Sequence, residues 1–299
     1  MLRVLVTGAS GQLGRHVVAA LEGAGHHARA LTRARTFTAG GVAPSEVVTG
    51  DLTAPSTLAR VCDDVDAVIA CGGASMRLAG WRDRASFTEV DHLGNLNLLA
   101  RASAAGVRRF VYVSLFGAHA VAHTEYARAH EAFVGELERA GIPHTVVRPT
   151  GYFSTFAEML PLAARGRAAV VGDGSARTNP VHEADVASCC VAALESGARE
   201  VEIGGPDVLT RREIAALACE AVGRPVVIRS VSPGVVRAAT APLRLLNPRI
   251  HALVEFGTAV SLVDAVAPAV GGRSLHDHFA ALGAHHQMGR RPPHAAIAA

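Results

Sequence analysis

The stretch LRVLVTGASGQLGRHVV, residues 2–18, decides the fold. Residues 2–7 form a short run rich in apolar and β-branched side chains, which predicts a buried strand. Residues 12–24 carry apolar side chains at helical spacing, and Gly8, Gly11 and Gly14 lie at the junction. A strand that passes through a glycine turn directly into a helix is typical of the first unit of a nucleotide-binding α/β domain.

Each glycine has a separate physical role in such a turn. Gly8 permits the tight turn, Gly11 lets the backbone approach a pyrophosphate, and Gly14 lets the helix pack close to the sheet. The free N–H groups and the positive dipole end of the helix then support the phosphates. We therefore expect a dinucleotide cofactor to be held by Gly8, Ser10, Gly11, Gln12, Leu13 and Gly14.

The same alternation of strand and helix continues along the chain. Helix-like segments at 55–61, 86–105 and 125–140 separate further strand candidates at 28–32, 46–50, 66–71, 108–114 and 144–149. Strands that are apolar on both faces and alternate with helices indicate a parallel sheet covered on both sides. The expected fold class is α/β, a doubly wound parallel sheet of the Rossmann type, which binds ligands at the carboxyl ends of its strands.

The pattern divides the chain into three parts. Residues 1–150 are expected to form the Rossmann core, and residues 151–285 a substrate-binding portion interleaved with it. In the second part Thr210 and Glu213 have the spacing of a capping box at the start of a helix. Residues 286–299 are interpreted as a flexible tail.

The composition excludes several classes of protein. Of the 299 residues, 49% are hydrophobic and 18% charged, which argues for a globular chain, and no apolar run approaches the ~20 residues that a membrane helix needs. The five cysteines form no CxxC pair, the histidines near the C-terminus lack partners for a metal, and the arginines are too scattered for a nucleic-acid surface. The N-terminus has no secretory pattern, so we expect a cytoplasmic monomer or homodimer.

The second strand indicates which nicotinamide cofactor is preferred. An NAD-binding protein usually has an acidic residue at the end of this strand, which binds the ribose hydroxyls. Here no acid occurs from His26 to Gly41, and Arg33 and Arg35 lie close to the strand end. Arginine favours a 2′-phosphate, although two solvated surface arginines are the alternative. The sequence therefore predicts NADP(H).

Several motifs, in order along residues 1–230, resemble the short-chain dehydrogenase/reductase superfamily and, within it, its atypical NmrA-like and isoflavone-reductase-like members. They are TGASGQLG, GDLT at 50–53, DAVIACGG at 66–73, RFVYVS at 109–114, GIPHTVVRPTGYF at 141–153, NPVHEADVA at 179–187 and GGPDVLTRREIA at 204–215. The resemblance implies that Asp51 and Leu52 lie beside the adenine, that Gly72 and Gly73 pass under the cofactor, and that Pro149 lines the nicotinamide end. It also implies that Ser114 and Tyr126 are the catalytic serine and tyrosine.

The chain departs from this family at the third catalytic position. All 29 basic residues are arginine, and the lysine expected four residues after Tyr126 is His130. Residues four apart share a helix face, so His130 is expected near the place of the lysine, as a hydrogen-bond donor to the ribose or a proton relay. Tyr126, a water molecule or the substrate's own hydroxyl then remain as proton sources.

The substrate pocket is expected to be apolar. Phe116, Tyr152 and Phe153 follow strands of the predicted sheet, and core packing is the equal alternative for Tyr152 and Phe153. Few charges occur in the segments that would cover the pocket. These features favour an NADPH-dependent ketoreductase acting on a flat, hydrophobic carbonyl compound. The resemblance to a family whose bacterial members tailor secondary metabolites implies, by analogy alone, an aromatic polyketide-type ketone. Two alternatives are a catalytically silent NmrA-like NADP(H) sensor, which the absent lysine favours, and an NAD-dependent sugar-nucleotide epimerase, which the missing acid disfavours.

Overall fold

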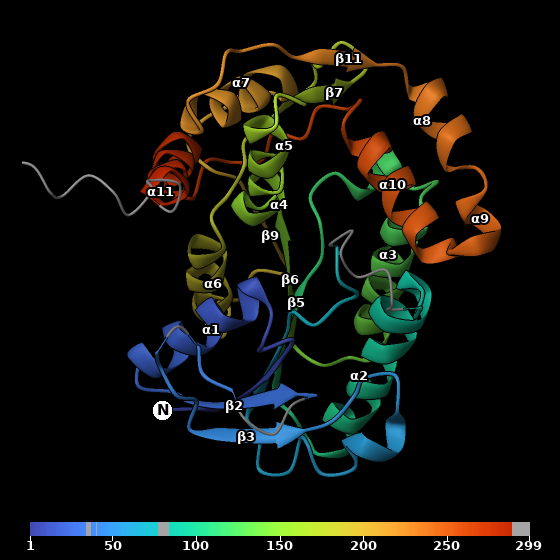
Figure 1. The fold of residues 1–299 in the computed structure, drawn as a ribbon. Helices are drawn as coiled ribbons and strands as arrows, with labels where there is room; N and C mark the ends of the chain where they lie inside the picture. Colours follow the sequence, from blue (N-terminus) through green and yellow to red (C-terminus); the bar gives the residue numbers. More distant parts are fainter. Residues whose placement is uncertain (34–36, 40, 77–83, 289–299) are drawn as a thin grey trace, which may run out of the picture.

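The computed structural model of the chain describes residues 1–33, 37–39, 41–76 and 84–288 (Figure 1). Its centre is a parallel sheet with the strand order β3-β2-β1-β4-β5-β6-β9. The strands are β1 (Arg3–Thr7), β2 (His27–Thr32), β3 (Glu46–Thr49), β4 (Ala67–Ala70), β5 (Arg109–Val113), β6 (His144–Pro149) and β9 (Glu200–Ile203). The predicted doubly wound Rossmann sheet is confirmed, and the segment after residue 199 adds its seventh strand.

Helices cover both faces of the sheet (Figure 1). One face is covered by α1 (Gln12–Gly23) and α6 (Glu183–Ala192), which pack against each other. The other face is covered by the π-helical segment η3 (Thr88–Gly94) with α2 (Asn95–Ala104) and α3 (Glu125–Arg139). Along β1, Val4 and Val6 belong to the core under α1, and Leu5 belongs to the core on the opposite face. This double burial explains why the strands are apolar without alternation.

The remaining elements lie above the carboxyl ends of the strands or beside them (Figure 1). Two small sheets, β10-β8 and β11-β7, join segments from the second half of the chain. The elements are η1 (Pro55–Leu58), η4 (Ala118–Val121), α4 (Phe153–Ala157), α5 (Leu160–Ala164), β7 (Ala169–Val171), β8 (Arg177–Thr178), β10 (Leu209–Thr210), α7 (Arg211–Ala221), β11 (Arg229–Val231), α8 (Pro233–Thr240), α9 (Leu243–Leu246), α10 (Pro248–Val260) and α11 (Leu275–Met288). The predicted capping box of Thr210 and Glu213 is present at the start of α7.

Three sequence expectations need correction. The segment at 55–61 forms only the short 3₁₀ turn η1, and 86–105 begins as a π-helix before continuing as α2. α11 extends to Met288, so the predicted tail at 286–299 begins as helix, and residues 289–299 lie outside the described residues. No helix in the described ranges is long and apolar enough to cross a membrane.

Phe133 tests the core beneath α3. Its fully buried ring packs on Tyr112, at 4.6 Å between ring centroids. Phe133→Ala should lower the free energy of unfolding by about 3–5 kcal/mol, because it leaves a cavity between α3 and β5. Urea denaturation measures the change. The control Val235→Ala, at a side chain that is 59% exposed, should change stability by less than about 0.5 kcal/mol. An equal effect of the two substitutions would contradict this assignment.

Candidate active site

The candidate site lies where the strand order reverses. β1 pairs with β2 on one side and β4 on the other, and the chain leaves the carboxyl ends of β1 and β4 in opposite directions. A crevice opens at such a point in a doubly wound sheet, and ligands bind there. The glycine turn follows β1, and Cys71 with Gly72 follows β4.

The loops after β1 and β4 touch at backbone distance. A Cβ atom on Gly8, whose φ is +65°, would lie 2.5 Å from the Cα of Gly72. A Cβ atom on Gly14 would lie 2.1 Å from the carbonyl oxygen of Gly8. That carbonyl accepts a hydrogen bond from the N–H of Gly11 at 2.8 Å. Side chains at Gly8 and Gly14 are therefore excluded, and the start of α1 is held close to the sheet.

The N-terminus of α1 has the features of an anion-binding site. Its first turn contains no acidic residue, and no side chain caps it. Ser10, Gly11 and Gln12 are exposed, whereas Leu13 and Gly14 are buried beneath them. The first backbone N–H groups and the positive end of the helix therefore point to a surface that a pyrophosphate can reach. These residues fit the dinucleotide cofactor that the sequence predicted.

At the predicted adenine end, Arg33 and Asp51 lie near each other beyond β2 and β3. Hydrogen bonds from the backbone N–H and the hydroxyl of Thr53 lower the pKa of Asp51, and the charge of Arg33 lowers it further. Arg33 is exposed, and the carbonyl of Leu52 accepts a hydrogen bond from Asn97 at 2.9 Å. Arg35, predicted to assist Arg33, lies outside the described residues.

At the predicted nicotinamide end, two glycines bring the chain after β4 close to its neighbours. The N–H of Gly72 donates to Thr7 Oγ1 at 3.2 Å, and a Cβ atom on Gly73 would lie 2.4 Å from Asp91 Oδ1. Pro149 ends β6, and its carbonyl accepts a hydrogen bond from Phe116. The predicted cofactor contacts of Gly72, Gly73 and Pro149 thus gather at the carboxyl edge of the sheet.

Tyr126 is held among aromatic rings in the first turn of α3. Its ring centroid lies 4.5 Å from that of His130 and 4.5 Å from that of Phe256 on α10. No hydrogen bond joins its hydroxyl to any residue in the described part of the chain. Burial, and then the carboxyl of Asp91, raise the pKa of Tyr126 well above its ordinary value. The phenol therefore keeps its proton at neutral pH and has that proton available to a ligand.

His130 is neutral and does not replace the charge of a lysine. It is 5% exposed, and burial lowers its pKa to about 3. Its Nδ1 lies 2.7 Å from the hydroxyl of Tyr112, and its Nε2 is buried without a hydrogen-bond partner among the described residues. The prediction that Tyr126 and His130 share a helix face is confirmed.

Asp91 is a buried carboxyl beside His130 that the sequence reasoning missed. It is 1% exposed, and burial raises its pKa to about 8, so it is largely protonated at pH 7. Its Oδ1 accepts a hydrogen bond from Ala74 N–H at 3.1 Å and lies 3.8 Å from His130 Nε2. The two side chains are therefore a pair of neutral polar groups and not an ion pair.

A sequence signal for Asp91 existed. Buried residues recur at helical spacing through η3 and α2, and Asp91 occupies one position of that apolar face between Phe87 and Leu98. An acid on the buried face of an amphipathic helix indicates a carboxyl that must be paired or protonated. Phe256 had no comparable signal, because only the tertiary contact with Tyr126 distinguishes it.

Ser114 is bonded within an ion-pair network. Its hydroxyl donates to Glu131 and accepts from Arg148, each at 3.3 Å, and Arg148 forms ion pairs with Glu131 and Glu200. No hydrogen bond joins Ser114 and Tyr126 in the described residues. The catalytic role of Ser114 stays a prediction, since its hydroxyl proton points to Glu131 in this structure.

The three predicted substrate residues lie in different surroundings. Tyr152 is half-buried, and burial followed by the nearby phenol of Tyr126 raises its pKa far above normal. Phe116 is half-buried beside Pro149. Phe153 is fully buried, with its ring edge-on to His182 and tilted against His278, so of its two predicted roles the structure supports the core position, beneath α11, and not a pocket wall.

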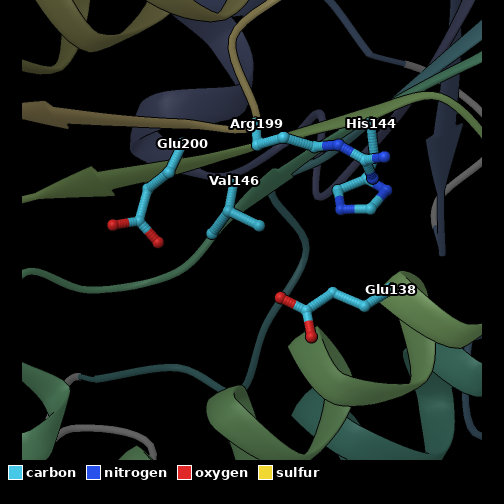
Figure 2. A pocket seen from close by; sticks show the side chains of 5 residues that line it. All are labelled: Glu138, His144, Val146, Arg199 and Glu200. Atoms are coloured by element: carbon cyan, nitrogen blue, oxygen red, sulfur yellow. The ribbon is translucent and has the colours of Figure 1, made fainter.

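A separate surface groove lies at the opposite edge of the sheet. It has a volume of about 350 Å³ and is lined by Glu138, His144, Val146, Arg199 and Glu200 (Figure 2). These residues belong to the end of α3 and to the beginnings of β6 and β9. Because ligands of doubly wound sheets bind at the carboxyl ends, this groove is not the candidate site.

Comparison with known proteins decides the family. The family described as NAD(P)H-binding matches residues 8–197, well over half of the chain. The chain belongs to this family. It is an atypical member of the short-chain dehydrogenase/reductase superfamily, as its motifs predicted, and its cofactor is NAD(P)H.

Individual relatives carry the names of reductases. The chain is 31% identical over 225 residues to a divinyl chlorophyllide a 8-vinyl-reductase of Zea mays, covering 68% of this chain and 55% of that protein. It is 29% identical over 251 residues to a (4-alkanoyl-5-oxo-2,5-dihydrofuran-3-yl)methyl phosphate reductase of Streptomyces griseus, covering 83% of each. A triphenylmethane reductase from Citrobacter sp. complexed with NADP(H) has the same fold, with a TM-score of 0.72 at 21% identity over 94% of this chain and 99% of that one.

Arg33 tests the predicted cofactor preference. Arg33→Ala should weaken NADPH binding about tenfold and leave NADH binding unchanged, because only NADPH carries the 2′-phosphate that the guanidinium would bind. Fluorescence titration of both cofactors measures the effect. The control is Arg60→Ala, at a side chain that is 89% exposed and pairs with Asp63, and it should leave the affinity for both cofactors unchanged. Equal weakening of both cofactors by Arg33→Ala would refute a 2′-phosphate site.

Asp91 tests the neutral pair through pH. The folded protein holds the Asp91 proton to about pH 8, whereas the unfolded chain loses it near pH ~4. Between these values the folded state binds more protons, so this group makes the free energy of unfolding fall as pH rises. Measured relative to Asp91→Asn, the wild-type value should fall by about 1 kcal/mol per pH unit from about pH 5 to about pH 8.

The pH effect has a matched control on the surface. Asp64 has a side chain that is 85% exposed, so Asp64→Asn should give a difference from wild type that does not vary with pH over the same range. Urea denaturation at each pH provides all the values. A constant difference between wild type and Asp91→Asn would mean that Asp91 is ionised in the folded protein.

Proposed function

We propose that this protein is an NADPH-dependent reductase of a flat, hydrophobic carbonyl compound. The observation that carries the proposal is the Tyr126 phenol, which lies beside Tyr152 at the carboxyl edge, keeps its proton and has no described hydrogen-bond partner. A protonated hydroxyl without a partner beside a nicotinamide site is what a ketone oxygen needs as a donor. The preference for NADPH over NADH follows from Arg33 at the adenine end.

The surroundings of Tyr126 favour an apolar substrate. The Phe256 ring packs against the Tyr126 ring at a tilt, and Phe87 contacts it edge-on at 5.1 Å between centroids. Leu115 and Val260 belong to the same apolar cluster. These walls suit an aromatic, polyketide-type ketone better than a sugar nucleotide, which would need several polar partners. The names of the maize and Streptomyces relatives support reduction as the reaction class.

The chemistry needs one hydride and one proton. Bound NADPH supplies the hydride. The Tyr126 hydroxyl holds the carbonyl oxygen by a hydrogen bond and transfers its proton to the oxygen as negative charge develops there. Although the pKa of Tyr126 is raised, an alkoxide is a stronger base than a phenolate, so this transfer is downhill. A lysine is not needed to make the phenol more acidic when the product is an alkoxide.

His130 and Asp91 act through position and hydrogen bonding in this proposal. The His130 ring supports the face of Tyr126, and the hydroxyl of Tyr112 fixes the imidazole through Nδ1. His130 Nε2 and Asp91 Oδ2 are both buried without described partners. A cofactor ribose hydroxyl or a water molecule would satisfy both atoms, so these residues are the ones that would hold the ribose in place of the lysine.

A second candidate function has its own support. His130 is neutral, and no lysine occurs in the chain, so the residue that assists proton transfer in the family is missing. An NmrA-like sensor would bind NADP(H) without consuming it. The same assay separates the two functions.

Tyr126 tests the reductase proposal. NADPH oxidation is measured with a panel of polycyclic aromatic ketones and quinones, and Tyr126→Phe should lower kcat at least about 100-fold on a ketone, because the proton donor is lost. NADPH affinity should change little. Ser188→Ala, which removes an exposed hydroxyl on α6 away from Tyr126, is the control and should retain the activity. Tight NADPH binding without turnover of any compound would favour the sensor and overturn the reductase proposal.

A further inference from the structure

We propose that Arg211 binds an acidic group of the substrate, a carboxylate or a phosphate monoester, about one helical turn away from the carbonyl that is reduced. The inference rests on the proposed function, since it places the acid in relation to Tyr126. It narrows the substrate class from a hydrophobic carbonyl compound to one that also carries an anionic group.

Arg211 is the first residue of α7 and is largely enclosed by protein. Its Nη2 donates to the carbonyl of Val260 at 2.8 Å, and its guanidinium lies over the ring of Phe156 at 5.6 Å from the centroid. Its Nε is buried without a hydrogen-bond partner among the described residues. Burial lowers the pKa of Arg211 to about 10, so the group remains charged at neutral pH but is poorly solvated.

Two other enclosed arginines of this protein have carboxylate partners, whereas Arg109 donates several hydrogen bonds, to the carbonyls of Ala193 and Ser196 and to Thr145. Arg29 pairs with Glu46 at 2.7 Å, and Arg148 pairs with Glu131 and Glu200. Asp264 is the acid whose charge acts on Arg211, but its carboxylate forms an ion pair with Arg177 at 3.0 Å. A guanidinium has five N–H donors. Among the described residues the Arg211 side chain donates one hydrogen bond, to Val260, so four donors remain for a ligand or water. A bound anionic ligand would replace the hydration that the Arg211 guanidinium loses on burial.

Helix α10 connects Arg211 with the site of the proposed chemistry. Phe256 packs against Tyr126, and Val260, four residues later on the same helix face, presents its carbonyl to Arg211. Four residues of helix span about 6 Å along the axis. Val260 and Phe256 also belong to the apolar cluster that includes Tyr126.

A second connection gives the same spacing from the opposite side. Tyr152 lies near the Tyr126 phenol, and Phe156, four residues later, lies under the Arg211 guanidinium. The N–H of Phe156 donates to the carbonyl of Tyr152 at 3.3 Å, as in a helical turn. Two independent segments therefore place Arg211 about one turn beyond the Tyr126 and Tyr152 phenols. A substrate with its carbonyl at Tyr126 would extend its other end to Arg211.

The experiment compares an anionic probe with its neutral methyl ester. 9-Fluorenone-2-carboxylate, which is a ketone, and its methyl ester are titrated into the NADP⁺-loaded protein by calorimetry, and NADPH oxidation is followed with each. Since a charge-assisted hydrogen bond is lost with the ester, the carboxylate should bind wild-type protein at least about tenfold more tightly. Equal affinity for the two probes, or no binding of the carboxylate, would overturn the proposal without any variant.

Variants then locate the anion site. Arg211→Met should remove the preference by weakening carboxylate binding alone, with ester and NADPH affinities unchanged, and Arg211→Lys should keep part of it. The matched control is Arg212→Gln, since the neighbouring Arg212 is already bonded to the Asp173 carbonyl and to Ser230. A preference that survives Arg211→Met would place the anion elsewhere. Binding is measured without turnover, so loss of NADPH oxidation alone would count against the reductase proposal and not against Arg211.

Discussion

The contact between the backbone loops after β1 and β4 is the constraint on which the rest of the site depends. Gly8 and Gly72 approach so closely that neither can carry a side chain, and Gly14 holds α1 against the same turn. This contact fixes the start of α1 at the carboxyl edge, where its N–H groups face outward. It also fixes Gly73 beside Asp91, which links the cofactor end of the crevice to the buried polar groups under Tyr126.

Asp91 and His130 show how buried polar groups can be accommodated where the family has a lysine cation. A lysine next to a buried, protonated Asp91 would draw off the carboxyl proton and create an ion pair with a large desolvation cost. A neutral histidine avoids that cost, because Asp91 and His130 can both stay uncharged. The consequence is a phenol that is a weaker acid than one beside a lysine. In the proposed reductase, such a site favours substrates whose reduced oxygen is itself strongly basic.

Local sequence patterns were sufficient for the sheet and for the glycine turn. Strand β6 has its predicted bounds, and Tyr126 and His130 lie ring to ring, because helical spacing alone places them together. The burial of Asp91, Phe153 and Arg211 depends on which distant segments of the chain cover them. Burial of Phe153 by α11 and of Arg211 by α10 joins residues far apart in the chain, and no local pattern encodes such a contact. The protonation of Asp91 follows from burial in the same way.

The segment that leads to α10 differs from the sheet below it. Neither α8 nor α9 contains a fully buried side chain, whereas the central strands are almost entirely buried. Regions with few buried contacts open at a lower free energy than the core and do so independently of it. Helices α8 and α9 therefore form a less stable cooperative unit than the central sheet. A global unfolding measurement would report on the sheet, whereas local opening of α8 and α9 would be visible only to a local probe such as amide hydrogen exchange.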